Sequence, residues 1–186
     1  MTTALVTPPA LEPLTLAEVK AHLRIDHAHE DVLLADLLSA ARRHVEQAVG
    51  VSLITQIWRQ YADAVPDGGL RLAVRPAQAI EAVTAFAADG TPRVLASSQY
   101  HLLRGNGTAR LVVHTEPVSC ANGLEIDVRA GFGDLGVDVP DTLKRAILLL
   151  CAHWYEFRGV VHPSQQPVSM PPGFDVLVAP FREVRL

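Results

Sequence analysis

The stretch that decides the fold is Asp138–Arg158, DVPDTLKRAILLLCAHWYEFR, which lies late in the sequence. Its apolar residues recur at spacings of three and four and so form one stripe along a helix. Asp138 can cap the start of this helix, and Pro140 suits its first turn, where the missing N–H of proline costs nothing. Gly159 is expected to end it. The stripe contains Leu143, Ala146, Ile147, Leu150, Trp154 and Phe157.

Two further helices are predicted near the N-terminus. Thr15 and Glu18 have the spacing of a capping box, which predicts a short helix to about Arg24. After a restart at residues 26–30, a long amphipathic helix is predicted to continue to Gly50. Together, residues 15–50 are expected to form a helical hairpin. The apolar face of the long helix contains Val32, Leu34, Leu37, Leu38, Ala41, Val45 and Ala48.

Between the second and third helices, over residues 53–130, the period of the apolar residues changes from helical to alternating. Alternation indicates strands, and the Gly-rich turns between them indicate antiparallel hairpins. Because no strand alternates regularly with a helix, the predicted fold class is α+β, with an antiparallel β excursion that meanders between helices two and three. The expected strands are 53–61, 70–75, 83–88, 91–95, 100–104, 109–113 and 124–130.

The two ends of the chain are expected to be extended. Three prolines in the first dozen or so residues predict an N-terminal arm, and four prolines within 160–172 predict an extended segment. Residues 174–179 can form one short helical turn. We therefore predict a domain over 1–159, with helices in 15–50 and 138–158, and an extended C-terminal docking tail over 160–186. The tail can dock on a partner or fold back on its own domain, and the sequence leaves both open.

The composition indicates a folded protein, because 49% of the 186 residues are hydrophobic and only 19% are charged. A net charge of −4 without a basic block argues against a protein that grips nucleic-acid phosphates. Cys120 and Cys151 lie too far apart for a zinc knuckle, so we expect free thiols. The longest apolar run is too short to span a membrane, and no signal peptide is evident, which favours a cytosolic protein.

Residues Gly131–Gly136, GFGDLG, match the dinucleotide-binding pattern G-x-G-x-x-G. That function requires a helix that begins inside the motif and a later strand with an acidic residue roughly 20 positions on. Here Asp138-Val139-Pro140 delays the helix, and the acidic residue at that distance, Glu156, lies within the helix. A glycine-rich connection from strand to helix is therefore the preferred interpretation.

Two groups of possible metal ligands are interpreted as structural. His22, Asp26, His27, His29 and Glu30 lie close together in sequence, but they lack an ordered pair such as H-E-x-x-H and suit a solvated helix junction. His153 and Glu156 are neighbours on the last helix and form a surface pair. No nucleophile or phosphate-binding motif occurs. We therefore expect no catalytic, cofactor or metal site.

Three stretches together resemble the head-to-tail connector, or adaptor, proteins of long-tailed phages and gene transfer agents. The order and spacing of these stretches cover nearly the whole chain. The β excursion resembles that of the larger family members. The stretches are LTLAEVKAHLRIDHAHEDVLLADLLSAARRHVEQAVG at 14–50, VPDTLKRAILLLCAHWYEFRG at 139–159 and PPGFDVLVAPFREVRL at 171–186.

The resemblance implies a structural protein without catalytic activity. It implies a homo-oligomeric, dodecameric ring beneath the portal protein, which extends the DNA channel and offers a platform to the next neck protein, the stopper. DNA would pass through the lumen without sequence-specific binding. The protein would be present in the host cytoplasm during assembly and then in the neck of the particle. The alternatives are another neck or tail-completion protein, such as a mainly β stopper, and an unrecognised small enzyme.

The resemblance also implies roles for particular residues. The C-terminal segment would reach the portal, with Phe181, Val184 and Leu186 as anchors and with Arg182 and Arg185 paired with portal carboxylates. The apolar helix faces would serve both the core and the packing between subunits. The residues expected in this packing are Leu34, Leu38, Val45, Leu143, Ile147, Leu150, Trp154 and Phe157.

Overall fold

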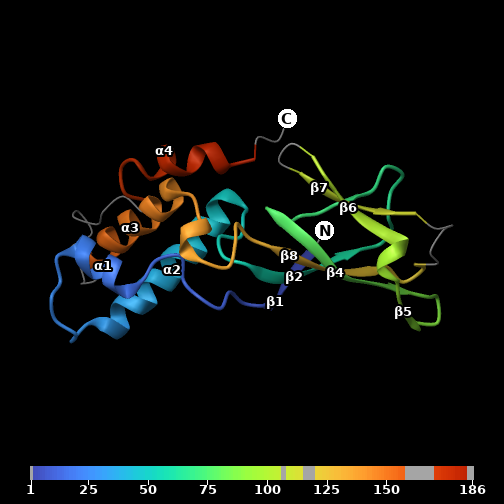
Figure 1. The fold of residues 1–186 in the computed structure, drawn as a ribbon, viewed down its shortest axis with the longest axis horizontal. Helices are drawn as coiled ribbons and strands as arrows, with labels where there is room; N and C mark the ends of the chain where they lie inside the picture. The colour runs from blue at the N-terminus through green and yellow to red at the C-terminus, as the bar shows by residue number, and fades with distance from the viewer. Residues whose placement is uncertain (1, 106–107, 115–119, 158–169, 184–186) are drawn as a thin grey trace. The chain divides into compact units, whose positions relative to one another are not determined.

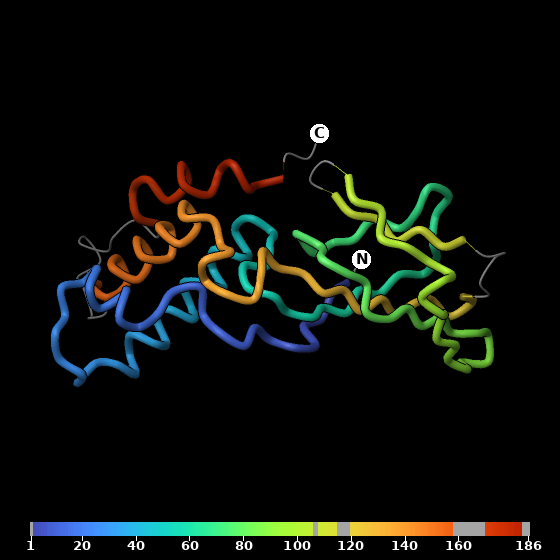
Figure 2. The backbone as a smooth tube through the Cα atoms, in the orientation of Figure 1, coloured from blue at the N-terminus to red at the C-terminus, as the bar shows by residue number. Residues whose placement is uncertain are grey.

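The structure is a computed structural model that describes residues 2–105, 108–114, 120–157 and 170–183. The chain divides into two compact units, each built from two separate segments. Met1–Ala10 and Thr55–Phe132 form the β unit, and Leu11–Ile54 and Gly133–Leu186 form the helical unit. Figure 1 labels the α-helices and every strand except β3, and Figure 2 traces the backbone from the N-terminus (blue) to the C-terminus (red).

In the residues that the structure describes, the helical unit contains four α-helices with a core between them. They are α1 (Leu16–Leu23), α2 (Asp31–Val49), α3 (Asp141–Glu156) and α4 (Phe174–Val178). Helix α3 packs against the other three helices, and α2 also contacts α1 and α4. Their buried residues lie at helical spacing, as the apolar stripes predict. This core includes Val19, Leu34, Leu38, Ala41, Val45, Leu143, Ala146, Ile147, Leu150 and Phe174.

The local signals for the first two helices are confirmed. The hydroxyl of Thr15 accepts the Glu18 N–H at 3.2 Å, and the Glu18 carboxylate accepts the Thr15 N–H at 2.7 Å, which completes the capping box. The bonds from the Thr15 N–H and hydroxyl lower the pKa of the Glu18 carboxyl. Helix α2 ends at Gly50, which adopts a left-handed conformation with φ of 67°. Val32, which the sequence placed on the apolar face, is 79% exposed.

The third helix is shorter than the sequence predicts. It begins at Asp141, because Pro140 holds the preceding Val139 in an extended conformation with ψ of 131° and acts as the N-cap itself. Asp138 therefore does not cap α3; its carboxylate accepts the Leu135 N–H at 3.0 Å around the short 3-10 helix Gly136–Asp138. The helix ends at Glu156. Gly159, the expected terminator, lies outside the described residues.

The β unit contains two antiparallel sheets. The five-stranded sheet has the order β1-β2-β8-β4-β5, and the three-stranded sheet has the order β3-β7-β6. Their apolar faces form one cluster of buried residues that includes Leu70, Val83, Leu111 and Ile126. The strands are β1 (Thr2–Thr7), β2 (Gln56–Ala62), β3 (Leu70–Arg71), β4 (Ala77–Phe86), β5 (Pro92–Val94), β6 (Tyr100–Arg104), β7 (Ala109–Val113) and β8 (Leu124–Ala130).

The order of these strands corrects one expectation and extends another. The β excursion is antiparallel but does not meander, because its last strand, β8, pairs with both β2 and β4 in the middle of the five-stranded sheet. The N-terminal arm is extended over Thr2–Thr7, as expected, and this segment also pairs with β2 as an edge strand. Both pairings join residues distant in sequence, which local alternation does not encode.

The C-terminal segment folds back in the part that the structure describes. Phe174 and Val178 are fully buried, and α4 contacts α2 and α3. The predicted short turn at 174–179 is confirmed as α4 followed by the 3-10 helix Ala179–Phe181. The predicted division between residues 159 and 160 lies in 158–169, outside the described residues, and stays a prediction. An extended conformation is wrong for 174–181, because burial of Phe174 favours a helical turn packed on α3.

Candidate assembly surfaces

The histidines and acidic residues between α1 and α2 do not converge. The carboxylate of Asp31 pairs with Lys20 at 2.7 Å, and Glu30 accepts a hydrogen bond from the hydroxyl of Tyr155 on α3. Burial lowers the pKa of His22, and nearby Arg145 lowers it further. Throughout the described part of the chain, no three His, Cys, Asp or Glu side chains come together to hold a metal ion. This segment therefore joins two helices.

In the glycine-rich loop, other parts of the chain lie so close to two of the glycines that a larger residue would clash with them. A Cβ atom on Gly133 would lie 2.2 Å from the Asp138 carboxylate, and one on Gly136 would lie 2.4 Å from the carbonyl oxygen of Pro13. Helix α3 begins five residues after Gly136, so its N-terminal N–H groups lie beyond the motif. The loop thus needs small residues for packing, and its geometry differs from that of a dinucleotide-binding turn.

The β unit contains an open depression of about 440 Å³. Tyr61 and Asp63 at the end of β2 line it together with Asn122 and Glu125 at the start of β8, and Tyr61 lies opposite Glu125 on the paired strand. Its lining contains the hydroxyls of Thr2 and Tyr61 but no histidine, lysine or cysteine. The other lining residues are Thr2, Ala62, Ala64, Pro66, Leu70, Phe86, Gly123 and Leu124.

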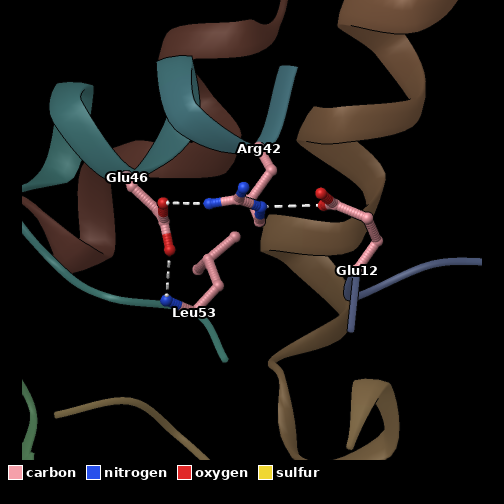
Figure 3. A network of polar contacts seen from close by, with 4 residues as sticks. All are labelled: Glu12, Arg42, Glu46 and Leu53. Carbon is pink, nitrogen blue, oxygen red and sulfur yellow. Dashed lines mark hydrogen bonds and ion pairs between the residues drawn. The ribbon is translucent and has the colours of Figure 1, made fainter. Parts of the chain in front are cut away.

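Arg42 is the centre of a buried polar network that sequence reasoning missed (Figure 3). Its side chain is only 7% exposed; Nε lies 2.7 Å from a Glu12 carboxylate oxygen, and Nη1 lies 2.7 Å from Glu46. The second Glu46 oxygen accepts the Leu53 N–H at 2.9 Å. The network joins α2 to the segments before α1 and after α2. The available signal was an arginine on the buried face of α2, four residues before a glutamate.

Six of the eight residues expected in core or subunit packing are buried in the helical unit: Leu34, Leu38, Val45, Leu143, Ile147 and Leu150. Trp154 is half-buried, and its ring lies edge-on to His44 with a centroid distance of 5.8 Å. Phe157 is 44% exposed, and its ring lies 5.0 Å from that of His153. His153 therefore contacts Phe157, whereas Glu156 is exposed to solvent.

Of the residues expected to dock on a portal, the structure describes Phe181 and Arg182. Phe181 is half-buried at the end of the 3-10 helix that follows α4. Arg182 is exposed and already pairs with Asp175 of α4 at 2.7 Å. Val184, Arg185 and Leu186 lie outside the described residues. The described part of this segment is therefore held on the helical unit by Phe174, with Arg182 near the surface.

Exposed apolar side chains occur on several elements of the helical unit. Val32 at the start of α2 is 79% exposed, and Val137 in the loop before α3 is also 79% exposed. Val176 on α4 is 77% exposed. Among the residues that the structure describes, no helix combines the length and apolarity needed to cross a membrane.

The thiols of the two cysteines are free, as the sequence predicts. Cys151 on α3 is fully buried, and this burial raises the pKa of its thiol to about 12, with a smaller contribution from Glu12. Cys120 is half-buried. A thiol that stays protonated at neutral pH is a poor nucleophile, so Cys151 serves the core of the helical unit.

Comparisons with known proteins find one family and several solved structures that resemble this chain. Residues 13–90 match the profile described as phage gp6-like head-tail connector protein. The chain has no match among curated protein sequences. Its structure resembles a chain in the neck of an empty gene transfer agent particle computed with C6 symmetry, with a TM-score of 0.82 and 28% identity. The likeness covers 100% of this chain and 97% of that chain.

Two further solved structures are similar over the same extent, with 100% of this chain and 97% of the other covered in each. One is a chain in the virion of a native gene transfer agent particle, with a TM-score of 0.81 and 28% identity. The other is a chain in the neck of the native particle computed with C12 symmetry, with a TM-score of 0.78 and 25% identity. Over residues 13–90 the chain is similar to the phage gp6-like head-tail connector family, and over its whole length it has the fold of a chain from the neck of a gene transfer agent particle.

Proposed function

We propose that this protein is a structural connector, or adaptor, subunit at the head-tail junction of a phage-like particle. The observation that carries the proposal is the likeness to neck chains, which extends over the whole length of the protein with TM-scores of 0.78 to 0.82. The match of residues 13–90 to the connector family points the same way. Two independent comparisons, one of sequence and one of structure, therefore support one role.

In this proposal, copies of the chain assemble as a ring, with twelve subunits when complete. The neck structures with C6 and C12 symmetry support a cyclic arrangement. In a ring of identical subunits, each subunit contacts one neighbour through one face and the other neighbour through a different face. Such a head-to-tail contact closes into a ring when the rotation between neighbouring subunits divides a full turn evenly. Exposed apolar residues on α2, on the loop before α3 and on α4 supply candidate faces, through Val32, Val137 and Val176.

The ring would sit on the portal protein and offer a platform to the next neck protein. We propose that residues 181–186 contribute to the portal contact, with Phe181, Val184 and Leu186 as apolar anchors and Arg185 as a partner for a carboxylate. Arg182 would contribute by exchanging its exposed partner Asp175 for a portal carboxylate, which costs little because surface ion pairs are weak. DNA would pass through the lumen, a role that suits a chain with a net charge of −4.

A stopper-like neck protein is the second candidate within the same class, and it would be mainly β. The helical unit with α1, α2, α3 and α4 favours the connector. A small enzyme is the candidate from another class. The lining of the depression in the β unit contains no histidine, lysine or cysteine, and the glycine-rich loop serves close packing, so neither feature favours that candidate.

The test is size-exclusion chromatography with light scattering on the protein mixed with the portal encoded beside it. We expect a stoichiometric complex with the intact chain and weaker or no binding after removal of residues 181–186. Ala179→Ser, which changes an exposed residue just after α4 without shortening the chain, is the matched control for that removal. Absence of any complex, with both proteins folded, would refute the connector assignment.

A further inference from the structure

The three-stranded sheet of the β unit exposes a row of side chains that is basic and apolar. Arg71 on β3 lies opposite Arg110 on β7, and Arg110 lies opposite Leu103 on β6. Residues in register on adjacent antiparallel strands point to the same side, so these three side chains share one face. All three side chains are exposed to solvent, and Leu103 is 48% exposed. The neighbouring row, Leu70, Leu111 and Leu102, points into the core.

The charge of this face is one-sided. Its charged residues are Arg71 and Arg110, and the three strands, all of whose residues the structure describes, contain no acidic residue. Arg104, next to Leu103, points to the other side and donates to the Gln78 carbonyl. The acidic residues nearest in sequence are Asp67, in the turn before β3, and Glu116, after β7 and outside the described residues; Arg110 donates to the Gly68 carbonyl at 3.3 Å. Like charges directly opposite each other destabilise a strand pair. The pairing of Arg71 with Arg110 therefore suits a surface that meets an anionic partner.

The same positive field acts on a third arginine. Burial lowers the pKa of Arg75, and the charge of Arg71 lowers it further. Arg75 follows β3 by four residues, so the positive charge extends beyond the strands themselves. We call the row Arg71, Arg110 and Leu103 the arginine face.

The helical unit exposes a loop of the opposite character between β8 and α3. Leu135 is 54% exposed and Val137 is 79% exposed, so two large apolar side chains stand in solvent. Asp134 and Asp138 flank them and are both exposed. The Asp138 carboxylate accepts a hydrogen bond from the Leu135 N–H within the loop. The Asp134 side chain is exposed at the surface. We call residues 134–138 the DLGVD loop.

We propose that the arginine face of one subunit packs against the DLGVD loop of the next, with Leu103 against Leu135 and Val137 and with arginines around them. This inference rests on the ring of the proposed function and names the contact that closes it. Three features select a second copy as the occupant. The charges are opposite, each surface has an apolar centre, and the two surfaces differ, as a head-to-tail contact requires. An apolar centre within a charged rim is also the usual layout of a protein interface.

The test uses two charge reversals, Arg110→Glu and Asp134→Arg, in the full chain. Assembly is followed by sedimentation velocity over a concentration series, alone and with the portal. Each reversal is expected to raise the concentration for half-assembly about tenfold or more, because like charges then meet in the contact. Matched controls are Arg93→Glu on β5 and Asp36→Arg on α2, two exposed residues outside both surfaces, which should assemble as the wild type does. Circular dichroism and thermal unfolding establish that every variant is folded.

Mixing the two variants makes the test specific. In an alternating ring, the glutamate introduced by Arg110→Glu in one subunit meets the arginine introduced by Asp134→Arg in the next. The remaining contacts keep the natural pair of Arg110 and Asp134. Assembly should therefore return in an equimolar mixture of the two variants, although each alone fails. A mixture that stays as weak as its components would overturn the inference, even when the wild type assembles.

The remaining outcomes are also decisive. If both reversals assemble as the wild type does, this contact is refuted and the ring of the proposed function stands. If the wild type neither assembles alone nor binds the portal, the proposed function and this inference fall together. A last outcome concerns duplex DNA. If Arg110→Glu abolishes DNA binding, Arg93→Glu leaves it unchanged, and assembly is unaffected in both variants, the occupant of the arginine face is nucleic acid. The subunit contact is then overturned.

Discussion

Replacing Arg42 by methionine is expected to destabilise the helical unit strongly. The substitution keeps an unbranched side chain of similar length but removes the guanidinium that lies 2.7 Å from both Glu12 and Glu46. Figure 3 shows that the two carboxylates approach Arg42 from different segments of the chain. Without Arg42, Glu46 still accepts the Leu53 N–H but loses the cation that compensates its charge.

The size of the effect follows from the burial of the partners. Removing one member of a buried ion pair costs roughly 3–5 kcal/mol, because a charge is left without compensation. The side chain of Glu46 is 12% exposed and cannot regain full hydration, whereas that of Glu12 is 29% exposed and recovers part of it. We therefore expect a loss near the lower limit, about 3 kcal/mol in the free energy of unfolding.

The assay is urea unfolding followed by circular dichroism at the helical wavelength, which reports on α1, α2 and α3. With a dependence on urea of about 2 kcal/mol per M, a loss of this size lowers the midpoint by about 1.5 M. The matched control is Arg43→Met, the same change at the next residue of α2, which is exposed. Its effect should stay within about 0.5 kcal/mol.

A second substitution separates lost charge compensation from lost packing. Glu46→Gln keeps an oxygen that can accept the Leu53 N–H but removes the charge. Added to Arg42→Met, it should recover about 1 kcal/mol or more, because the buried negative charge is then removed as well. The reasoning is refuted if Arg42→Met costs no more than Arg43→Met, or if Glu46→Gln makes the Arg42→Met protein still less stable.

Three further predictions concern the helices and the thiols. Phe174→Ala should cost about 3–5 kcal/mol in urea unfolding, because its ring is fully buried, whereas Val176→Ala on the same helix should be nearly neutral; equal effects would contradict the packing of α4. Thr15→Ala removes the hydroxyl of the capping box and should cost about 1 kcal/mol, with Thr15→Ser as the conservative control that keeps the wild-type midpoint. At pH 8 a thiol reagent should label Cys120 before Cys151. The raised pKa of about 12 keeps the Cys151 thiol protonated until the pH approaches that value or the protein unfolds. Rapid labelling of a Cys120→Ser protein at pH 8 would contradict this.

Several elements could be predicted closely because their signals are local. The predicted strands 100–104, 109–113 and 124–130 coincide with β6, β7 and β8. The capping box before α1 and Gly50 after α2 marked the ends of these helices correctly. Each signal depends on residues within a few positions of one another, as turns, caps and alternation do.

One error has a local cause. The sequence places the start of α3 three residues early, because Asp138 is a good capping residue in isolation, while Pro140 restricts the residue before it.

The other differences come from contacts between distant residues. The extended conformation of the N-terminal arm agrees with the structure, but its pairing with β2 is not encoded locally. For the assembly surfaces, three stretches of sequence supplied the resemblance to a connector family, whereas the arginine face depends on cross-strand register that no single stretch reveals.

The sequence by itself determined where the helices and most strands form and the α+β class. These properties arise from periodicity, caps and turns, which operate over a few residues. The resemblance of three stretches to a connector family was also visible in the sequence. Only the tertiary structure decided that β8 lies between β2 and β4, that the chain divides into a β unit and a helical unit, and that Arg42 is buried between Glu12 and Glu46. Those features depend on contacts between residues far apart in the chain, where many pairings satisfy the same local pattern and the packing of the whole selects one.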